Sequence, residues 1–337
     1  MDTLPEAFGM LRLLGLWKSD KWIITVIGKM MNVLGQRHQI IELMRSLEVI
    51  QFQPKNEKEH QLKEQCIKSI RFYTHAYIAF VGILAIVHNS LVMLECYKKG
   101  SLPYKVWFPY NVSNIYLFTS FQQVITIIFV AHINVTYDTL LLGILFHICL
   151  QVNILKHRFH GMLNDLQGIL SLKGDMNSEE YRTLEKTLIT EYVMYQNAIF
   201  KLVENLTDIF SLTMFLQFGL SALILCTSIY ALAQTSIFSP EFIGCTVYIV
   251  CMISHIFLPC LIGNQMTLEF SELNDAIYST NWYTLSNNFR KCMNLIMIRS
   301  SKPVTFSSGY VISLSLGAFK SLIKLSYSIY NVFQQSS

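Results

Sequence analysis

The stretch IFSLTMFLQFGLSALILCTSIYALA, residues 209–233, contains no Asp, Glu, Lys or Arg. The hydrocarbon core of a membrane is roughly 30 Å thick, so a helix of about 20 apolar residues crosses it. A helix is expected because it satisfies its own backbone hydrogen bonds in lipid. The stretch FIGCTVYIVCMISHIFLPCLIGN, residues 242–264, meets the same criterion. Together the two stretches predict an all-α integral membrane protein.

Five stretches in all are long and apolar enough to span a membrane. They are residues 76–94, 115–135, 209–233, 242–264 and 308–333. The second is followed by a further apolar run, which predicts a long helix that projects beyond the membrane.

The segment WIITVIGKMMNVLG, residues 22–35, is more ambiguous because it is short and carries Lys29 near its middle. About 20 apolar residues are needed to cross the bilayer. We expect this segment either to lie at the membrane interface or to be the remnant of a span.

The composition argues against a soluble fold. Of 337 residues, 52% are hydrophobic and 14% are charged, against roughly 25% charged in soluble domains. The eight cysteines have no paired C-x-x-C spacing, so neither a disulfide framework nor a zinc site is expected. His157 and His160 lie one helical turn apart, but no further ligand follows at a matching spacing, so no metal or other cofactor is expected. The sequence motifs of hydrolases, metalloproteases, P-loop and dinucleotide-binding enzymes are absent, which predicts that the protein is not an enzyme.

Lys and Arg are distributed unevenly between the connections. Residues 1–75, 156–208 and 265–307 carry 21 of them, whereas the opposite connections carry three. Cytoplasmic loops keep the excess of basic residues. The N-terminus is therefore expected in the cytoplasm and, after five spans, the C-terminus outside. The sequon at Asn111 then lies outside, where it could be glycosylated.

The connections resemble helical extensions of the spans, because charged and apolar residues alternate in them at helical spacing. We therefore expect one membrane domain and no separate soluble domain. Its parts are a cytoplasmic N-terminal segment with an interfacial helix (1–75), a transmembrane region (76–333) that includes cytoplasmic helices (140–208 and 265–307), and an extracellular tail (334–337).

Polar residues recur every three or four positions along the last span. They are Ser313, Gly317, Lys320, Lys324, Tyr327, Asn331 and Gln334. A lysine that faces lipid at mid-membrane costs roughly 2.5–3.5 kcal/mol, so Lys320 and Lys324 are expected to face water or protein. One explanation is a water-lined pathway. The other is that the lysines reach toward the cytoplasmic headgroups while the stripe packs on neighbouring helices.

The C-terminal third carries a specific pattern, with a Gly, a Glu-x-Ser, an Ala-Ile-Tyr, a Trp, an Arg-Lys, an Arg-Ser-x-Lys-Pro and a final Ser-Tyr-Ser in this order. The matching residues are Gly263, Glu269, Ser271, Ala276, Ile277, Tyr278, Trp282, Arg290, Lys291, Arg299, Ser300, Lys302, Pro303, Ser326, Tyr327 and Ser328. This pattern resembles the signature of the insect odorant receptors. The loop LPYKVWFPYN, residues 102–111, and the series Asp138, His147 and Gln151 also resemble that family.

The resemblance implies a helical bundle of seven spans, of which this chain shows five that match the third to the seventh. It implies an odorant receptor subunit of a ligand-gated, non-selective cation channel that binds small volatile organic ligands. The partner would be the family's shared co-receptor, in a hetero-oligomer that we expect to be a tetramer. The location would be the plasma membrane of olfactory sensory neurons, with the N-terminus in the cytoplasm. No nucleic acid is expected as a partner.

The resemblance also assigns three sets of residues. The pore set on the last span is Lys320, Lys324, Tyr327, Tyr330, Asn331 and Gln334. Tyr330 and Gln334 match the positions of the constriction. The ligand-binding set in the outer halves of the spans is His88, Leu91, Tyr116, Thr119, Gln122 and Tyr248, although for any single one of these ordinary helix packing is the stronger alternative. The anchor set, where subunits would meet, is Asp138, His147, Gln151, Tyr278, Trp282 and Pro303.

Two alternatives remain open on the sequence alone. Because the first span and most of the second have no counterpart in this sequence, the chain could be a truncated, non-conducting receptor isoform. A gustatory receptor is the other alternative, although the ending SYSIYNVFQ reverses the final residue pair of that group.

Overall fold

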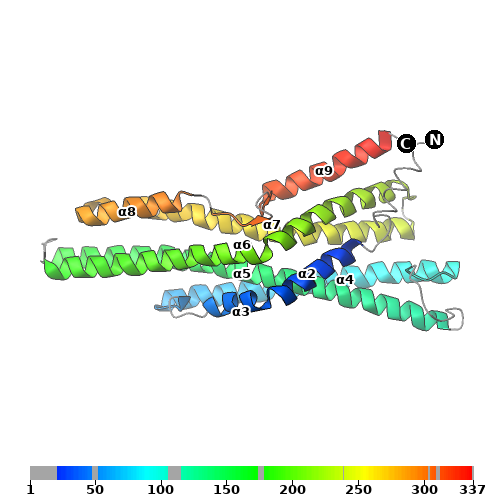
Figure 1. Cartoon of the computed structure of the whole chain (residues 1–337), viewed down its shortest axis with the longest axis horizontal. Helices are drawn as coiled ribbons and strands as arrows, with labels where there is room; N and C mark the ends of the chain where they lie inside the picture. Colours follow the sequence, from blue (N-terminus) through cyan, green and yellow to red (C-terminus); the bar gives the residue numbers. More distant parts are fainter. Residues whose placement is uncertain are drawn as a thin grey trace.

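Long helices that run side by side dominate the computed structural model (Figure 1). The structure describes residues 21–47, 52–104, 115–173, 178–237, 239–302, 304–308 and 312–335. The helices are α2 (Lys21–Gly35), α3 (Arg37–Ser46), α4 (Glu57–Lys99), α5 (Tyr116–Lys173), α6 (Glu179–Ala233), α7 (Pro240–Tyr278), the 3-10 helix η3 (Trp282–Thr284), α8 (Asn287–Ser300) and α9 (Leu316–Gln335). The prediction of an all-α multi-span bundle is therefore confirmed.

The ends of the long helices follow from local sequence. Ser178 caps α6 by accepting a hydrogen bond from the backbone N–H of Tyr181, and Ser239 caps α7 by accepting one from Phe242. Serine is favoured there because the first N–H groups of a helix have no partner within it. Helix α4 ends at Gly100, whose φ of 61° is left-handed and favours glycine.

Four of the described helices are long and apolar enough to cross a membrane, namely α4, α5, α6 and α7. They carry the expected spans 76–94, 115–135, 209–233 and 242–264. Helix α9, which carries the fifth expected span, has 20 residues but lies outside that group. Its polar stripe makes it less apolar than the other four.

The expected start of the last helix at residue 308 is wrong. Two short antiparallel strands, β1 (Ser307–Ser308) and β2 (Ile312–Ser313), come first, and α9 begins only at Leu316. Ser315 explains this start, because its hydroxyl accepts a hydrogen bond of 3.2 Å from the backbone N–H of Ala318. Ser313 therefore belongs to a strand, and the polar stripe on the helix begins at Gly317.

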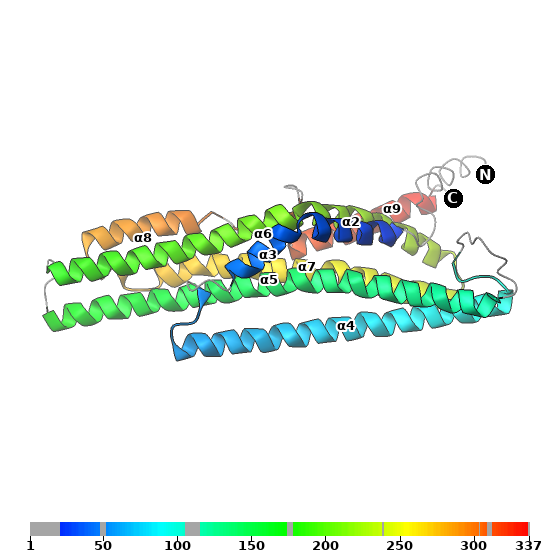
Figure 2. The ribbon, with the colours of Figure 1, turned by 60° about the horizontal axis from the view of Figure 1, so that its bottom comes forward.

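The end of the bundle opposite α9 holds a dense apolar core formed by α5, α6, α7 and α8, which lie together in both views (Figure 2). Fully buried side chains from several helices meet there, including Leu145, Phe159, Phe289 and Met293. These residues belong to the segments 140–208 and 265–307, which we expected to form helical extensions of the spans.

Trp282 and Tyr278 contribute less to this core than their size suggests. Trp282 is half-buried, and Tyr278 is 77% exposed. Aliphatic, Phe and Met side chains supply most of the packing within this core instead.

Candidate functional site

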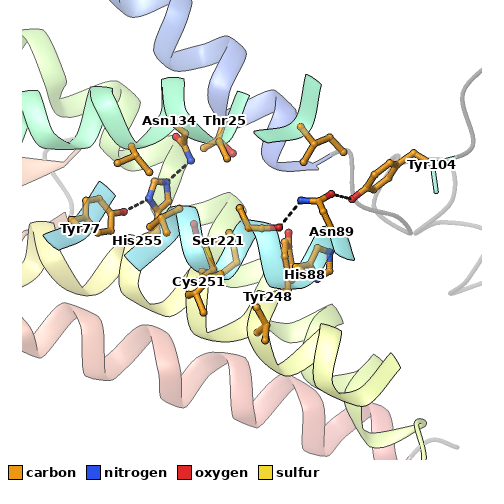
Figure 3. Close-up of a pocket in the computed structure, with 18 residues that line it drawn as sticks. Thr25, Tyr77, His88, Asn89, Tyr104, Asn134, Ser221, Tyr248, Cys251 and His255 are labelled. Atoms are coloured by element: carbon orange, nitrogen blue, oxygen red, sulfur yellow. Dashed lines mark hydrogen bonds between the residues drawn. The ribbon is translucent and has the colours of Figure 1, made fainter. Parts of the chain in front are cut away.

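A cavity of about 110 Å³ lies between α4, α5, α6 and α7, with α2 closing one side (Figure 3). Its walls are mostly apolar, with Val81, Leu84, Ile127, Val247 and Met252 among the lining residues. Polar side chains gather at its two ends. An apolar cavity with a few convergent polar groups is the usual form of a small-molecule site.

A polar cluster lies at one end of the cavity, with His255 on α7 at its centre. We call it the floor cluster, and it comprises Lys29, Tyr77, Asn134, Asp138 and His255. The Nδ1 atom of His255 lies 2.6 Å from Asp138 Oδ2 and 3.0 Å from the Tyr77 hydroxyl. Its Nε2 atom lies 2.8 Å from Asn134 Nδ2 and 3.2 Å from Lys29 Nζ. Because Nε2 faces two donors, it acts as the acceptor, and Nδ1 carries the proton toward the carboxylate.

Lys29 on α2 has an acceptor for each of its three protons. Its ammonium lies 2.5 Å from Asp138 Oδ1, 2.6 Å from Asn134 Oδ1 and 3.2 Å from His255 Nε2. The side chains of Lys29 and Asp138 are each only 1% exposed. A charge within a membrane bundle requires such a partner, because an unpaired one would be very costly.

Segment 22–35 lies in helix α2. Helix α2 packs on α6 and α5, with Thr25, Val26 and Lys29 buried and Met31 and Leu34 exposed. The segment therefore packs within the bundle, and its lysine faces the protein interior.

Pro259 orients the helix around His255. Proline has no backbone N–H, so the carbonyl of the residue four positions earlier, His255, lacks its usual helical donor. Gln217 on α6 compensates, with its Nε2 atom 3.3 Å from that carbonyl oxygen. The free carbonyl left by Pro259 thus allows Gln217 to link α6 to α7 beside the floor cluster.

The opposite end of the cavity, which we call the outer end, is formed by His88, Asn89 and Tyr104. The Nδ1 atom of His88 lies 3.0 Å from the carbonyl oxygen of Gly244 on α7. The hydroxyl of Tyr104 donates to Asn89 Oδ1 at 3.1 Å, while the Tyr104 backbone exchanges hydrogen bonds with Gln123. These contacts hold the segment after α4 against α4 and α5.

The structure brings only part of the predicted ligand-binding set together. His88 and Tyr248 line the cavity, with their ring centroids 5.9 Å apart. The other four do not line it. Tyr116 bonds to the Ser101 carbonyl, Thr119 bonds within its own helix, Gln122 is exposed and Leu91 is half-buried. The neighbour of Gln122, Gln123, bonds instead to the backbone of Tyr104, which lines the cavity.

The predicted set missed Thr25, Tyr77, Asn89, Asn134 and His255, all of which line the cavity. One signal was available, because Asn89, Asn134 and His255 are polar residues inside otherwise apolar spans. Periodicity alone does not show that they meet.

The predicted pore residues lie on the outward face of α9. Lys320 and Lys324 are exposed, Tyr327 is 58% exposed, and Tyr330 and Asn331 are half-buried. The side chain of Gln334 lies outside the described part of the structure. The opposite face packs on α6, where the Ser326 hydroxyl lies 3.5 Å from the Ala222 carbonyl oxygen.

The predicted anchor residues fall in different places. Asp138 belongs to the floor cluster, whereas His147 and Gln151 form a hydrogen bond of 2.9 Å on the projecting part of α5. Gln151 also accepts a hydrogen bond from Tyr195 on α6. Pro303, like Asn111, lies outside the described residues.

A second ion pair joins the start of α4 to the projecting part of α5. Glu59 is fully buried and accepts hydrogen bonds from Arg158 at 3.0 and 3.1 Å and from the Lys55 backbone at 2.8 Å. Burial alone would raise the pKa of Glu59, but these hydrogen bonds and the Arg158 charge outweigh it and lower the pKa. His157 lies 3.8 Å from the same carboxylate. Within the described ranges no group of three metal-ligating side chains occurs.

Comparison with known proteins gives consistent relatives. The chain is 25% identical to odorant receptor Or1 of Anopheles gambiae, over 92% of this chain and 78% of that protein. It is 27% identical to odorant receptor 94a of Drosophila melanogaster, over 90% of this chain and 77% of that protein.

The fold also matches a solved receptor structure. The olfactory receptor OR5 from Machilis hrabei, in complex with eugenol, superposes with a TM-score of 0.75 over 94% of this chain and 80% of that chain. Sequence identity there is 17%, so this similarity concerns the fold.

The family model for the 7tm odorant receptors matches residues 22–327. This match confirms the resemblance drawn from the C-terminal pattern, and it identifies a family of receptors rather than of enzymes. Because the match covers most of the chain, this protein belongs to the 7tm odorant receptor family.

Proposed function

We propose that this chain is the odorant-sensing subunit of a ligand-gated, non-selective cation channel. The observation that carries the proposal is the cavity, because it lies between the long apolar helices and its walls are apolar with polar groups at the two ends. Small volatile organic molecules have this character, with an apolar body and one or two polar groups. The receptor OR5, whose fold is similar, has a structure in complex with eugenol.

The pore would be lined by α9. Its exposed face carries Lys320, Lys324 and Tyr327, while Leu322 and Ser326 on the opposite face are buried against the bundle. Lysines on a helix face that points away from the subunit need water or another subunit beside them. This arrangement supports a pathway at the centre of an oligomer, with Tyr330 and Gln334 at the constriction.

The partner would be the family's co-receptor, in a hetero-oligomer that we propose to be a tetramer. Tyr278 is exposed and Trp282 is only half-buried against the core, so both leave surface for such a contact. The location would be the plasma membrane of olfactory sensory neurons, with the N-terminus in the cytoplasm and Asn111 outside.

Ligand-evoked current in cells that express this chain with the co-receptor tests the proposal. Met252→Trp should fill the cavity and abolish the ligand-evoked current, because Met252 lines it. Leu268→Trp is the matched control, since Leu268 lies on the same helix and is 48% exposed. Both variants are compared at equal surface labelling. Equal currents from the two variants would contradict the proposal.

The orientation is tested separately with an epitope tag after Ser337. In intact cells the tag should be labelled without permeabilisation. Labelling only after permeabilisation would overturn the proposed topology.

A non-conducting regulatory subunit is the second candidate. The apolar stretch 22–35 supports it, because it is shorter than the roughly 20 residues that a complete span needs and carries Lys29. Co-purification with the co-receptor without any current would favour this second function over the first. The other alternative, a gustatory receptor, is not retained because the chain belongs to the odorant receptor family.

A further inference from the structure

His88 presents one nitrogen to the protein and leaves the other available. Its Nδ1 atom lies 3.0 Å from the carbonyl oxygen of Gly244. A carbonyl can only accept a hydrogen bond, so Nδ1 must carry the proton of the ring. In the neutral imidazole the second nitrogen, Nε2, is then an acceptor with a free lone pair.

The neutral form is the one that the surroundings support. No carboxylate of a described residue pairs with His88, and the neighbouring walls are apolar. His88 is half-buried, so an imidazolium there would be a partly desolvated charge without a counter-ion, which is disfavoured. The Gly244 carbonyl therefore fixes both the tautomer and the role of Nε2.

No protein donor among the described residues reaches Nε2, although His88 lines the cavity (Figure 3). The neighbouring donors have other acceptors, since the Tyr104 hydroxyl bonds to Asn89 Oδ1 and Asn89 Nδ2 bonds to the Ala85 carbonyl. The Tyr248 ring lies beside the His88 ring, at 5.9 Å between centroids. The outer end of the cavity thus offers an acceptor next to an aromatic face.

We infer that this cavity selects ligands that carry a hydroxyl group, which donates its proton to His88 Nε2 while the carbon skeleton lies against the apolar walls. The inference rests on the proposed function, because it assigns a ligand class to the same cavity. An alcohol or a phenol supplies the donor that Nε2 needs, whereas an ether of the same size does not. Ser221 also lines the cavity, but its hydroxyl both donates and accepts, so it does not distinguish the two classes.

Pairs of isomers test this selectivity without a change in size. Suitable pairs are 4-ethylphenol with 4-methylanisole, benzyl alcohol with anisole, and 1-heptanol with 1-methoxyhexane. Binding to the purified full-length chain in lipid nanodiscs is measured through tyrosine and tryptophan fluorescence. The hydroxyl compound of a pair should bind about 3- to 10-fold more tightly, as expected for one net hydrogen bond.

His88→Phe should remove this preference, so that both members of each pair bind with equal affinity. The ratio of the two affinities measured on one variant is an internal control for the folding of that variant. The thermal unfolding midpoint of the variant checks its folding independently. His132→Phe is the matched control and should keep the preference, because His132 is exposed and bonds to the carbonyl of its own helix.

Equal affinity within all three pairs for the unmodified chain would overturn the inference. A preference that persists in His88→Phe, or one that disappears in Ser221→Ala instead, would also overturn it. These failures are distinct from failure of the proposed function, which would appear as absence of ligand-evoked current in co-expressing cells whatever the ratio. Current evoked equally by alcohols and ethers would leave the channel function standing and reject only the selectivity.

Discussion

The backbone of Leu314 lies directly over Gly263. A Cβ atom placed on Gly263 would stand 2.7 Å from both the carbonyl oxygen and the Cβ of Leu314. Such a distance is too short for non-bonded atoms, and backbone cannot move aside as a flexible side chain can. Gly263 thus allows the segment between the β strands and α9 to contact α7.

Gly263→Ala should therefore destabilise the protein, by about 1–3 kcal/mol as for other overpacked sites. It should lower the thermal unfolding midpoint of the purified chain. Gly219→Ala is the control, because nothing lies within 4 Å of a Cβ at Gly219 and alanine favours a helix. A midpoint for Gly263→Ala equal to that of the control would show that the contact with Leu314 is not close in solution.

Loss of the Lys29 charge should be more costly than loss of an exposed lysine. Lys29→Met leaves the Asp138 carboxylate buried with only the neutral His255 and its neighbours, and removal of one partner of a buried pair typically costs 3–5 kcal/mol. The measurement is the free energy of unfolding together with delivery to the cell surface. Lys68→Met is the control, since Lys68 is 79% exposed.

The double variant Lys29→Met, Asp138→Leu sharpens this prediction. Because it removes both charges, it should recover part of the stability that Lys29→Met loses. A double variant less stable than the sum of the two single variants would contradict the ion pair as the reason for burial.

The sequence predicted the four apolar spans because each is a continuous run in which lipid solvation alone selects a helix. It could not predict the floor cluster. Lys29 and Asp138 are 109 residues apart, and Lys29 and His255 are 226 residues apart. Hydropathy treats Lys29 as a penalty against a span, whereas the folded bundle supplies it with three acceptors. Such pairing depends on which helices are neighbours, and a single sequence does not contain that information.

The start of α9 was missed for a local reason. The polar stripe continues at helical spacing back to Ser313, so spacing alone places Ser313 in the helix. The capping hydroxyl of Ser315 and the pairing of Ser307 with Ser313 make the helix start later in the sequence than the pattern predicts.

For the cavity, His88 and Tyr248 were found because both are polar or aromatic and lie in the halves of the spans that we expected to be outermost. Tyr116 and Gln122 satisfy the same rule but do not line the cavity.

The stability should depend on pH through Glu59, which lies well before the expected span 76–94. Its folded pKa is below the ordinary value of 4.5. A carboxyl with a lowered pKa stabilises the fold fully above its unfolded pKa, and this contribution is lost as pH falls through the folded pKa. Glu59→Gln should therefore lower the unfolding midpoint at neutral pH and reduce its further fall below about pH 4. Glu64→Gln, an exposed change on the same helix, should leave the profile as it is.

The last prediction concerns the two faces of α9. Ser326 is 1% exposed and contacts α6, whereas the next residue, Tyr327, is 58% exposed. If the exposed face lines a pore, cysteine at Tyr327 or Tyr330 should react with a water-soluble thiol reagent and change the current of the co-expressed channel. Cysteine at Ser326 or Leu322 should be protected, because a helix turns about 100° per residue and these positions point into the subunit.

The unmodified chain is the control for background, since each of its eight cysteines is at least partly buried. A pattern of reactivity with a period of three to four residues would support the pore, because only one face of the helix would then meet water. Protection at every position from Leu322 to Tyr330, with current intact, would mean that another subunit covers this face and that the ions pass elsewhere.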